Sequence, residues 1–369
     1  MSPRHKAAIA LSGGVDSAVA AMLLRGQGWD LKCVHLRLTS WGASADWVQA
    51  LAQRLEIPLQ LIDLQREFSE EVLDYFVSEY GRGRTPNPCV RCNAAIKFGR
   101  LWEYLKEDGF THLATGHYAR LQPIEAAAPA LLRGVDPRKD QSYFLSRLPR
   151  DLLPNFLFPL GDLTKDEVRR IYHAANLPIQ EHQRESMELC FIPEGDYQDF
   201  LQARRGFIGP PGDFIDARGR VLGQHRGLEC YTVGQRRGLG IPAREPYYVT
   251  EIQPACNRVV LGPRAELFSS GLLASRMNWL IDPPDAEFEA VAVIRYRHPG
   301  VRARIIPRRS GEVQVEFETP QSAVAPGQAV VFYDRDRVLG GGWIETDNLR
   351  GGPGDVFREG PPPSPQTPS

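Results

Sequence analysis

A loop of small residues near the N-terminus joins an apolar strand to a helix, and this junction determines the fold class. The strand is predicted over residues 7–11 and the helix over residues 18–25, where Gly26 and Gly28 end it. Residues 12–17 between them read Ser-Gly-Gly-Val-Asp-Ser. Backbone N–H groups of such a turn converge on an anion at the positive end of the helix, and glycine lets the anion approach closely. The junction therefore predicts a phosphate-binding loop.

The side chains of this loop add polar groups around the anion. Ser12 and Ser17 can donate hydroxyl hydrogen bonds, and Asp16 can hold a magnesium ion or cap the helix. The lysine of the G-x-x-x-x-G-K-[ST] loop is missing. A plain turn capped by Asp16 is the alternative, and the position of the loop between a strand and a helix disfavours it.

Strands and helices continue to alternate after this junction. Further strands are predicted at residues 31–38, 59–64 and 111–114, and further helices at residues 47–55, 67–80 and 97–106. Repeated βα units predict an α/β N-terminal domain with a parallel sheet and helices on both faces. A Gly- and Pro-containing loop at residues 81–93 interrupts the pattern, and residues 125–129 are predicted to form an insertion or hairpin tip.

The second half of the chain has a different pattern. From residue 206 the composition shifts toward Gly, Pro and Arg with short strands, as in a small mixed central domain. A C-terminal β-barrel is predicted from strands at residues 288–296, 301–306, 313–317, 329–333 and 338–344. The last residues are rich in Pro, Gly and Ser and are predicted to be disordered. The predicted division is residues 1–200, 201–270, 271–350 and a tail at 351–369.

Composition excludes several classes of protein. Six cysteines are too few for a disulfide scaffold in a chain of 369 residues, so the close pair Cys89 and Cys92 is expected to be catalytic or metal-binding. No apolar run approaches the roughly 18 residues of a membrane helix, and no signal peptide is recognisable. We therefore expect a cytoplasmic protein that does not bind a membrane. Arginine gathers locally, most densely at residues 295–309, as either a solvated face or a surface for an anionic polymer.

The phosphate loop resembles that of the ATP pyrophosphatases, which cleave ATP to AMP and pyrophosphate while adenylating a substrate. This resemblance implies a PP-loop domain of the adenine nucleotide alpha hydrolase type. Further motifs resemble, in the same order, those of the tRNA-specific 2-thiouridylases, from about residue 6 to residue 349. The motifs lie at residues 85–93, 115–120, 139–145, 190–192 and 234–240.

The resemblance implies conversion of the wobble uridine (position 34) of tRNA to 2-thiouridine. ATP and Mg²⁺ would adenylate the uracil 2-oxygen, and a sulfur nucleophile would displace it. Cys190 would carry a persulfide received from a sulfur donor such as a cysteine desulfurase or a sulfur-carrier protein. Cys92 would assist release of the sulfur by forming a disulfide with Cys190 or by liberating hydrosulfide. The thiolate is the reactive form, and the nearby cations Arg91 and Lys97 would favour it.

The resemblance also implies contact residues. Those expected to bind the nucleotide are Ala10, Leu11, Ser12, Gly13, Gly14, Val15, Asp16, Ser17, Leu36 and Gly116. Those expected to meet the anticodon stem-loop of tRNA are Asn87, Pro88, Cys89, His117, Lys139, Asp140, Gln141, Arg295, Tyr296 and Gln328. The remaining cysteines are expected to be buried small hydrophobic residues, namely Cys33, Cys230 and Cys256.

One position departs from the family pattern. Many relatives carry aspartate, a candidate acid or base toward the uridine, where this chain has Cys89. Cys89, Cys92 and Cys190 could then supply three thiolates to a [4Fe-4S] cluster whose fourth iron binds sulfide. A zinc site, or a spare thiol at Cys89, are the alternatives.

Two other functions are compatible with parts of the sequence. One is an ATP pyrophosphatase-type synthetase that adenylates a small carboxylate or amide, which has no evident need for Cys92 and Cys190. The other is a non-enzymatic RNA-binding protein with a vestigial nucleotide loop, which would release no pyrophosphate when RNA is added.

Overall fold

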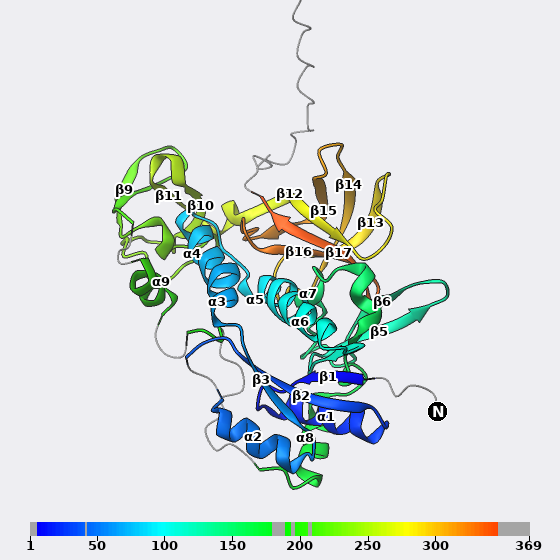
Figure 1. Ribbon diagram of the computed structural model, residues 1–369. Helices are drawn as coiled ribbons and strands as arrows, with labels where there is room; N and C mark the ends of the chain where they lie inside the picture. Colours follow the sequence, from blue (N-terminus) through cyan, green and yellow to red (C-terminus); the bar gives the residue numbers. More distant parts are fainter. Residues whose placement is uncertain (1–5, 41–42, 179–188, 193–195, 206–208, 346–369) are drawn as a thin grey trace, which may run out of the picture.

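The computed structural model describes residues 6–40, 43–178, 189–192, 196–205 and 209–345, and its first layer is a parallel sheet (Figure 1). Its strands run in the order β3-β2-β1-β4-β7, and all neighbours are parallel. Their bounds are β1 Lys6–Ala10, β2 Asp30–Arg37, β3 Leu59–Asp63, β4 His112–Ala114 and β7 Phe156–Leu157. The four strands predicted from the sequence are confirmed to within one residue at each end.

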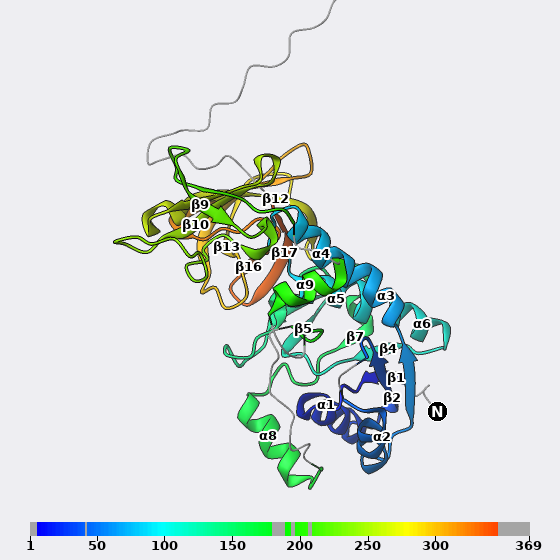
Figure 2. The ribbon, with the colours of Figure 1, turned by 90° about the vertical axis from the view of Figure 1, so that its left-hand side faces the viewer.

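Helices cover both faces of this sheet, because successive side chains of each strand point to opposite faces. On β1, Ile9 packs into a core with α1 (Val15–Gly26), α2 (Ala45–Arg54) and α8 (Lys165–Ala174). Its neighbour Ala8 belongs to the core on the other side. Figures 1 and 2 show α1, α2 and α8 together on one side of the sheet and α6 on the other.

The second face carries two chains of helical segments. These are α3 Gln65–Phe68, the π-helix η1 Ser69–Leu73 and α4 Asp74–Gly81, then α5 Pro88–Cys92, the π-helix η2 Asn93–Arg100 and α6 Leu101–Glu107. The loop predicted at residues 81–93 was therefore wrong in its second half. Asn87 caps α5 by accepting a hydrogen bond from Val90 N at 3.2 Å, and Pro88 follows as the first helical residue.

The predicted β-barrel is confirmed as six antiparallel strands in the order β12-β15-β14-β13-β16-β17, closed by pairing of β12 with β17. Their bounds are β12 Phe268–Trp279, β13 Phe288–Val293, β14 Val301–Pro307, β15 Val313–Ser322, β16 Ala329–Asp334 and β17 Arg337–Ile344. Five of these were predicted. The long strand β12 was missed because its register shifts twice and Arg276 has a positive φ of 49°. The tail expected at residues 351–369 lies outside the described residues.

Two smaller pieces join these layers. The hairpin predicted around residues 125–129 is formed by β5 (Ala119–Ile124) and β6 (Ala127–Arg133), and β6 pairs with β17. A separate four-stranded sheet has the order β10-β11-β8-β9. Its bounds are β8 Gly212–Ile215, β9 Val221–His225, β10 Tyr248–Gln253 and β11 Arg258–Gly262. The remaining helices are α7 Ser142–Leu145, α9 Tyr197–Arg205 and the short 3-10 helices η3 Arg150–Asn155, η4 Leu228–Cys230, η5 Pro254–Cys256 and η6 Arg264–Leu267.

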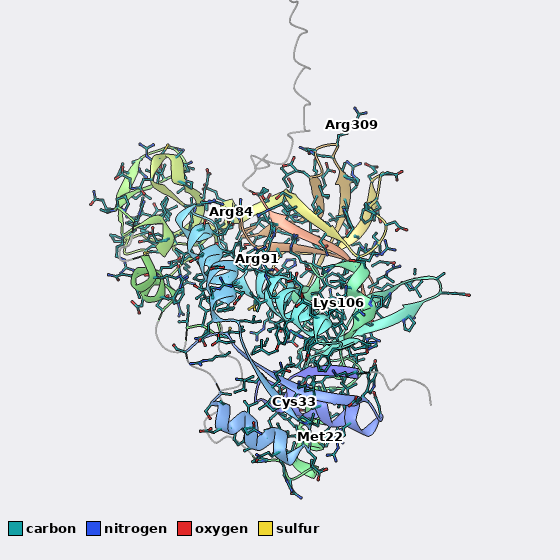
Figure 3. The ribbon with its side chains drawn as sticks, in the orientation of Figure 1. Met22, Cys33, Arg84, Arg91, Lys106 and Arg309 are labelled. Atoms are coloured by element: carbon teal, nitrogen blue, oxygen red, sulfur yellow. The ribbon has the colours of Figure 1, made fainter. Side chains whose placement is uncertain are left out.

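Arg84 fastens the segment before α5 to the barrel (Figure 3). Its Nε donates to Glu79 Oε2 at 2.7 Å, its Nη1 pairs with the Glu345 carboxylate, and its Nη2 donates to Ile344 O at 3.2 Å. The side chains of Arg84 and Glu79 are only 14% and 5% exposed. A largely buried guanidinium thus joins α4 to the end of β17.

Gln328, directly before β16, holds the next two residues of the same segment. Its Nε2 donates to Thr85 O and to Pro86 O, each at 3.1 Å. Thr85 N in turn donates to Pro326 O at 2.7 Å. The backbone that leads into α5 is therefore hydrogen-bonded to the barrel over two consecutive residues.

Replacing Arg84 by Met should lower the free energy of unfolding by on the order of 3 kcal/mol, because the buried Glu79 carboxylate loses its main partner. Urea denaturation measures this. Arg82→Met is the matched control, since Arg82 also pairs with Glu79 but is 68% exposed, and it should cost less than about 1 kcal/mol. Equal losses in the two variants would contradict the assignment of Arg84 as the junction.

Candidate active site

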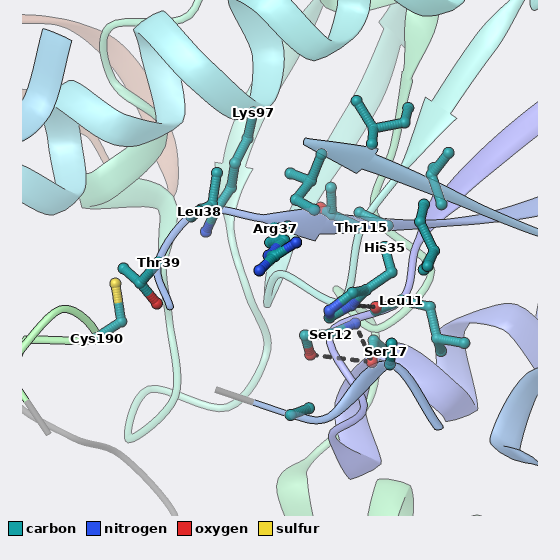
Figure 4. A pocket seen from close by; sticks show the side chains of 18 of the residues that line it. Leu11, Ser12, Ser17, His35, Arg37, Leu38, Thr39, Lys97, Thr115 and Cys190 are labelled. Carbon is teal, nitrogen blue, oxygen red and sulfur yellow. Dashed lines mark hydrogen bonds between the residues drawn. The ribbon is translucent and has the colours of Figure 1, made fainter. Parts of the chain in front are cut away.

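A cavity of about 930 Å³ opens where β1 and β2 end (Figure 4). Open α/β sheets bind ligands at the carboxyl ends of their strands, and this volume suits a small-molecule ligand. The residues predicted from the sequence that line it are Ala10, Leu11, Ser12, Asp16, Ser17, Leu36, Gly116, His117, Gln141 and Cys190. The nucleotide loop and one of the predicted catalytic thiols therefore share a single cavity.

The loop itself is shaped by hydrogen bonds among its own small residues. Ser17 Oγ donates to Gly14 O at 3.0 Å and accepts from Ser12 N at 3.2 Å. Gly13 has a φ of 87°, which glycine adopts without strain, and its carbonyl accepts from Trp47 Nε1 at 2.9 Å. Gly13, Gly14 and Val15 thus carry the backbone from the strand into α1.

Asp16 is held by two residues that the sequence reasoning missed. It does not cap α1, because Gly14 occupies that position without a side-chain bond. Its Oδ1 accepts from Lys165 Nζ and from the Tyr118 hydroxyl, both at 2.7 Å. Lys165 is 6% exposed and begins α8, directly after the capping residue Thr164. Tyr118 lies in the motif at 115–120, whereas no sequence spacing relates residue 165 to residue 16.

Gly116 brings a second wall of the cavity against the phosphate loop. A Cβ at this position would lie 3.0 Å from both Asp16 C and Ser17 N. Beside it, His117 Nδ1 lies 2.8 Å from Thr115 Oγ1, and His117 is buried. Burial, and secondarily Lys97, hold the pKa of His117 well below its usual range, so its imidazole is neutral at neutral pH.

The cysteines of the predicted site occupy two elements. Cys89 and Cys92 lie one turn apart on α5, half-buried and buried respectively, and Cys190 lies in a turn with its side chain exposed. Burial raises the pKa of Cys89 to about 11 and that of Cys92 to about 12. Surrounding protein also raises the pKa of Cys190, even though its side chain keeps contact with solvent. Each thiol is therefore predominantly neutral unless a cation stabilises its thiolate.

Phe191 anchors the residue next to Cys190. It is 2% exposed, and its ring centroid lies 5.1 Å from that of Phe76, 5.1 Å from that of Phe200 and 6.1 Å from that of Phe68. Edge-to-face contacts of this kind add to the burial of a large apolar ring. The packing fixes where the chain carrying Cys190 meets the helical layer.

The two cations expected near the thiols have different surroundings. Arg91 donates through Nε to Glu71 O at 3.1 Å and pairs with the Glu71 carboxylate. It does not line the cavity. Lys97, on η2, does line the cavity together with Cys190 and His117 (Figure 4).

Comparison with known proteins fits these three parts of the fold. A family profile described as "tRNA methyl transferase HUP domain" matches residues 5–194, one described as "tRNA methyl transferase PRC-barrel domain" matches residues 198–263, and one described as "Aminomethyltransferase beta-barrel domain" matches residues 269–344. The "tRNA-specific 2-thiouridylase MnmA" of Geotalea uraniireducens (strain Rf4) is 44% identical over 358 residues, 93% of this chain and 95% of that protein. This chain belongs to the tRNA-specific 2-thiouridylase family.

Other members of this family give the same result. The protein of the same name from Carboxydothermus hydrogenoformans is 44% identical over 363 residues, 93% of this chain and 98% of that protein. The one from Acidithiobacillus ferrooxidans (strain ATCC 53993 / BNL-5-31) is 44% identical over 347 residues, 92% of this chain and 98% of that protein. The fold class predicted from the sequence, an α/β domain followed by a small central domain and a β-barrel, is confirmed.

The tRNA contacts implied by this family lie in several places. His117 and Gln141 line the cavity, and Gln141 Oε1 accepts from Tyr118 N at 3.0 Å. Asp140 is buried, where it accepts hydrogen bonds from Gly134 N and Ser142 N. Its neighbour, the predicted contact residue Lys139, is half-buried on the same segment.

The remaining predicted tRNA contacts lie at the cysteine helix and on the barrel. Asn87 and Pro88 are buried at the start of α5. Arg295 is exposed, and its Nη1 donates to Ser322 O at 3.1 Å. Tyr296 packs against Phe144, with ring centroids 4.5 Å apart. The amide of the other predicted barrel contact, Gln328, is hydrogen-bonded to the backbone before α5.

The thiols as placed do not fit a metal cluster. Within the described ranges, no three His, Cys, Asp or Glu side chains converge closely enough to hold one metal ion. This applies to the three-cysteine [4Fe-4S] and zinc hypotheses alike. Of the other cysteines, Cys33 and Cys230 are buried as expected, but Cys256 is exposed on η5, so the prediction for that residue was wrong.

Among the described residues, no helix is long and apolar enough to cross a membrane.

Replacing Gly116 by Ala should weaken ATP binding about tenfold, because the new Cβ pushes against the backbone of Asp16 and Ser17. Isothermal titration with ATP measures this. Gly26→Ala is the control, since this residue ends α1 and a Cβ added there would meet no atom within 4 Å, so ATP affinity should be unchanged. Unchanged affinity in Gly116→Ala would mean that the nucleotide does not depend on this contact.

Proposed function

We propose that this chain catalyses ATP-dependent 2-thiolation of the wobble uridine of tRNA. One observation carries the proposal: the phosphate loop and the thiol of Cys190 line the same cavity. An enzyme that activates a base with ATP and then delivers sulfur to it needs both groups within reach of one substrate atom. The names of the relatives, tRNA-specific 2-thiouridylases, support the same reaction.

The reaction follows from the groups at the cavity. The uracil 2-oxygen attacks the α-phosphorus of ATP, an O–P bond forms and pyrophosphate leaves. The terminal sulfur of a Cys190 persulfide attacks C2, and AMP leaves with the former 2-oxygen. The Cys92 thiolate then attacks the Cys190 sulfur, which breaks the S–S bond to the base and releases 2-thiouridine. A Cys92–Cys190 disulfide remains, and a thiol reductant returns it to two thiols.

Residues of the loop would bind the triphosphate. Backbone N–H groups at the start of α1 would meet the phosphates, aided by the helix dipole. Asp16 fits a Mg²⁺ site in its chemistry, because it is a carboxylate at the cavity wall and Mg²⁺ takes one or two carboxylates along with phosphate oxygens. With Lys165 and Tyr118 on Oδ1, the second carboxylate oxygen, Oδ2, is the atom that would face the ion.

We assign the ATP and sulfur chemistry to residues 1–200 and contacts with the anticodon stem-loop to the barrel at residues 271–350. Exposed arginines of the barrel suit phosphate contacts, and Arg297 lies 5.5 Å from the ring centroid of Tyr296. A cysteine desulfurase or a sulfur-carrier protein would load Cys190, whose exposed side chain suits transfer from a partner. Because the cysteines do not converge on a metal position, the proposal uses the persulfide route.

Replacing Cys190 by Ser should abolish formation of 2-thiouridine, because serine cannot carry the transferable sulfur. Mass analysis of tRNA nucleosides after incubation with ATP, Mg²⁺ and a persulfide source measures this. Pyrophosphate release that depends on tRNA should persist, since adenylation precedes sulfur attack. Cys256→Ser, at an exposed site outside the cavity, is the control and should retain activity. Full thiolation by the Cys190 variant would instead favour a synthetase acting on a small molecule.

Protein purified without oxygen should hold far less iron than the roughly four atoms per chain of a [4Fe-4S] cluster, and should lack broad visible absorption while it thiolates tRNA. The reason is that the three thiols do not form a metal-binding group. Iron analysis, an absorption spectrum and the thiolation assay on the same sample measure this. A stoichiometric iron content whose loss abolishes thiolation would replace the persulfide route with the cluster.

A further inference from the structure

Lys97 reaches the cavity from the helical layer above the parallel sheet. It is half-buried on η2, and Figure 4 shows its side chain extending from the helix toward the side where Cys190 lies. Within the part of the chain that the structure describes, its ammonium makes no hydrogen bond and no ion pair. An ammonium held at a cavity wall without a carboxylate is a site for an anion.

The π-helix explains why Lys97 shares a side with the cysteines. An α-helix places residue i+4 near residue i, whereas a π-helix bonds i+5 to i. The π-helix η2 begins directly after Cys92, and Lys97 is five residues beyond that cysteine. The wider turn brings the ammonium back toward the face of α5 that carries Cys89 and Cys92.

The other cations near the cavity are already neutralised by carboxylates. Arg91 pairs with Glu71, and the buried Lys165 pairs with Asp16. Arg37 lines the cavity, but it is exposed and lies 3.9 Å from Asp63. Lys97 is thus the lysine or arginine of the described cavity wall whose charge has no protein counter-ion.

We propose that Lys97 is the cation that holds the sulfur nucleophile of this cavity in its anionic form. The anion is the thiolate of Cys190 before loading and its persulfide afterwards, and the thiolates of Cys89 and Cys92 fall within the same field. This role deepens the thiolation proposed above and rests on it for its biological purpose. The charge effect itself can be tested without tRNA or ATP.

The electrostatic balance supports this role. Desolvation raises the pKa of each of the three thiols, and Lys97 is the cation that lowers it in every case. Near Cys190 no other side chain lowers the pKa. The ionisable groups that line the cavity around this thiol are Asp16, His35, Arg37, Asp63, Lys97 and His117. His117 is neutral there, so the charge that favours the thiolate comes from the lysine.

The experiment is the rate at which iodoacetamide alkylates Cys190 in the full-length protein, followed by peptide mass spectrometry across a range of pH. Lys97→Met should slow alkylation at neutral pH about tenfold and move its pH midpoint upward, because the thiolate fraction falls. Lys97→Arg should restore most of the rate. Lys106→Met, at an exposed position of α6 (Figure 3), is the control and should match the unmodified protein.

Each outcome decides for or against the proposal. Equal midpoints in Lys97→Met and the unmodified protein would overturn it, as would a tenfold slower rate that Lys97→Arg fails to restore. A weaker affinity for ATP in Lys97→Met with unchanged alkylation would assign the lysine to the nucleotide instead. Lys97→Gln, which keeps a polar side chain, provides the same comparison if the Met variant does not fold. Absence of thiolation activity would refute the proposed function and leave the alkylation result standing.

Discussion

The buried contact of Arg84 with Glu79 and Glu345 holds the catalytic helix in its place between two domains. The guanidinium satisfies one carboxylate on α4 and another just beyond β17, and Gln328 adds two hydrogen bonds to the backbone that follows. Asn87 then caps α5, so the position of Cys89 is set from both sides. A buried pair of this kind adds little net stability but is costly to break. It therefore serves to fix geometry.

This junction gives the barrel a part in the chemistry that differs from surface contact with tRNA. The amide of Gln328, expected from the family to meet tRNA, is hydrogen-bonded to the segment that leads to the cysteines. Tyr296 likewise packs on Phe144 of the first domain, and Arg297 lies near its ring. Groups that could sense an RNA on the barrel are thus in direct contact with the domain that carries Cys92. Binding on one domain and sulfur chemistry on the other share these residues.

The sequence predicted the parts of this architecture that depend on local pattern. The strand before Ser12 has a buried centre and reads as an apolar run, and the glycines after it accept backbone conformations that other residues avoid. The predicted loop at residues 81–93 failed in its second half, although Asn87-Pro88 is itself a helix-start signal. The strand β12 failed because two register shifts break its alternation.

Long-range charge pairing was beyond the reach of sequence patterns. Lys165 meets Asp16 across 149 positions of chain, and only the packing of α8 on α1 brings them together. Arg91 stands beside Cys92 in the sequence, yet its charge is directed to Glu71. Nearness in sequence therefore misidentified one of the two cations expected at the thiols. Which cation acts there depends on where the helices turn.

The replacement of aspartate by Cys89 acquires a physical meaning in this arrangement. A carboxylate at that position would be ionised at neutral pH and would compete for the charge of Lys97. The Cys89 thiol, with its pKa raised to about 11 by burial, is neutral instead and leaves that charge to other anions. If Lys97 stabilises the sulfur anion, the exchange of an acid for a thiol removes a proton-handling group and at the same time strengthens the field at Cys190. The chain would then rely less on acid–base assistance and more on a nucleophile kept ionised by Lys97.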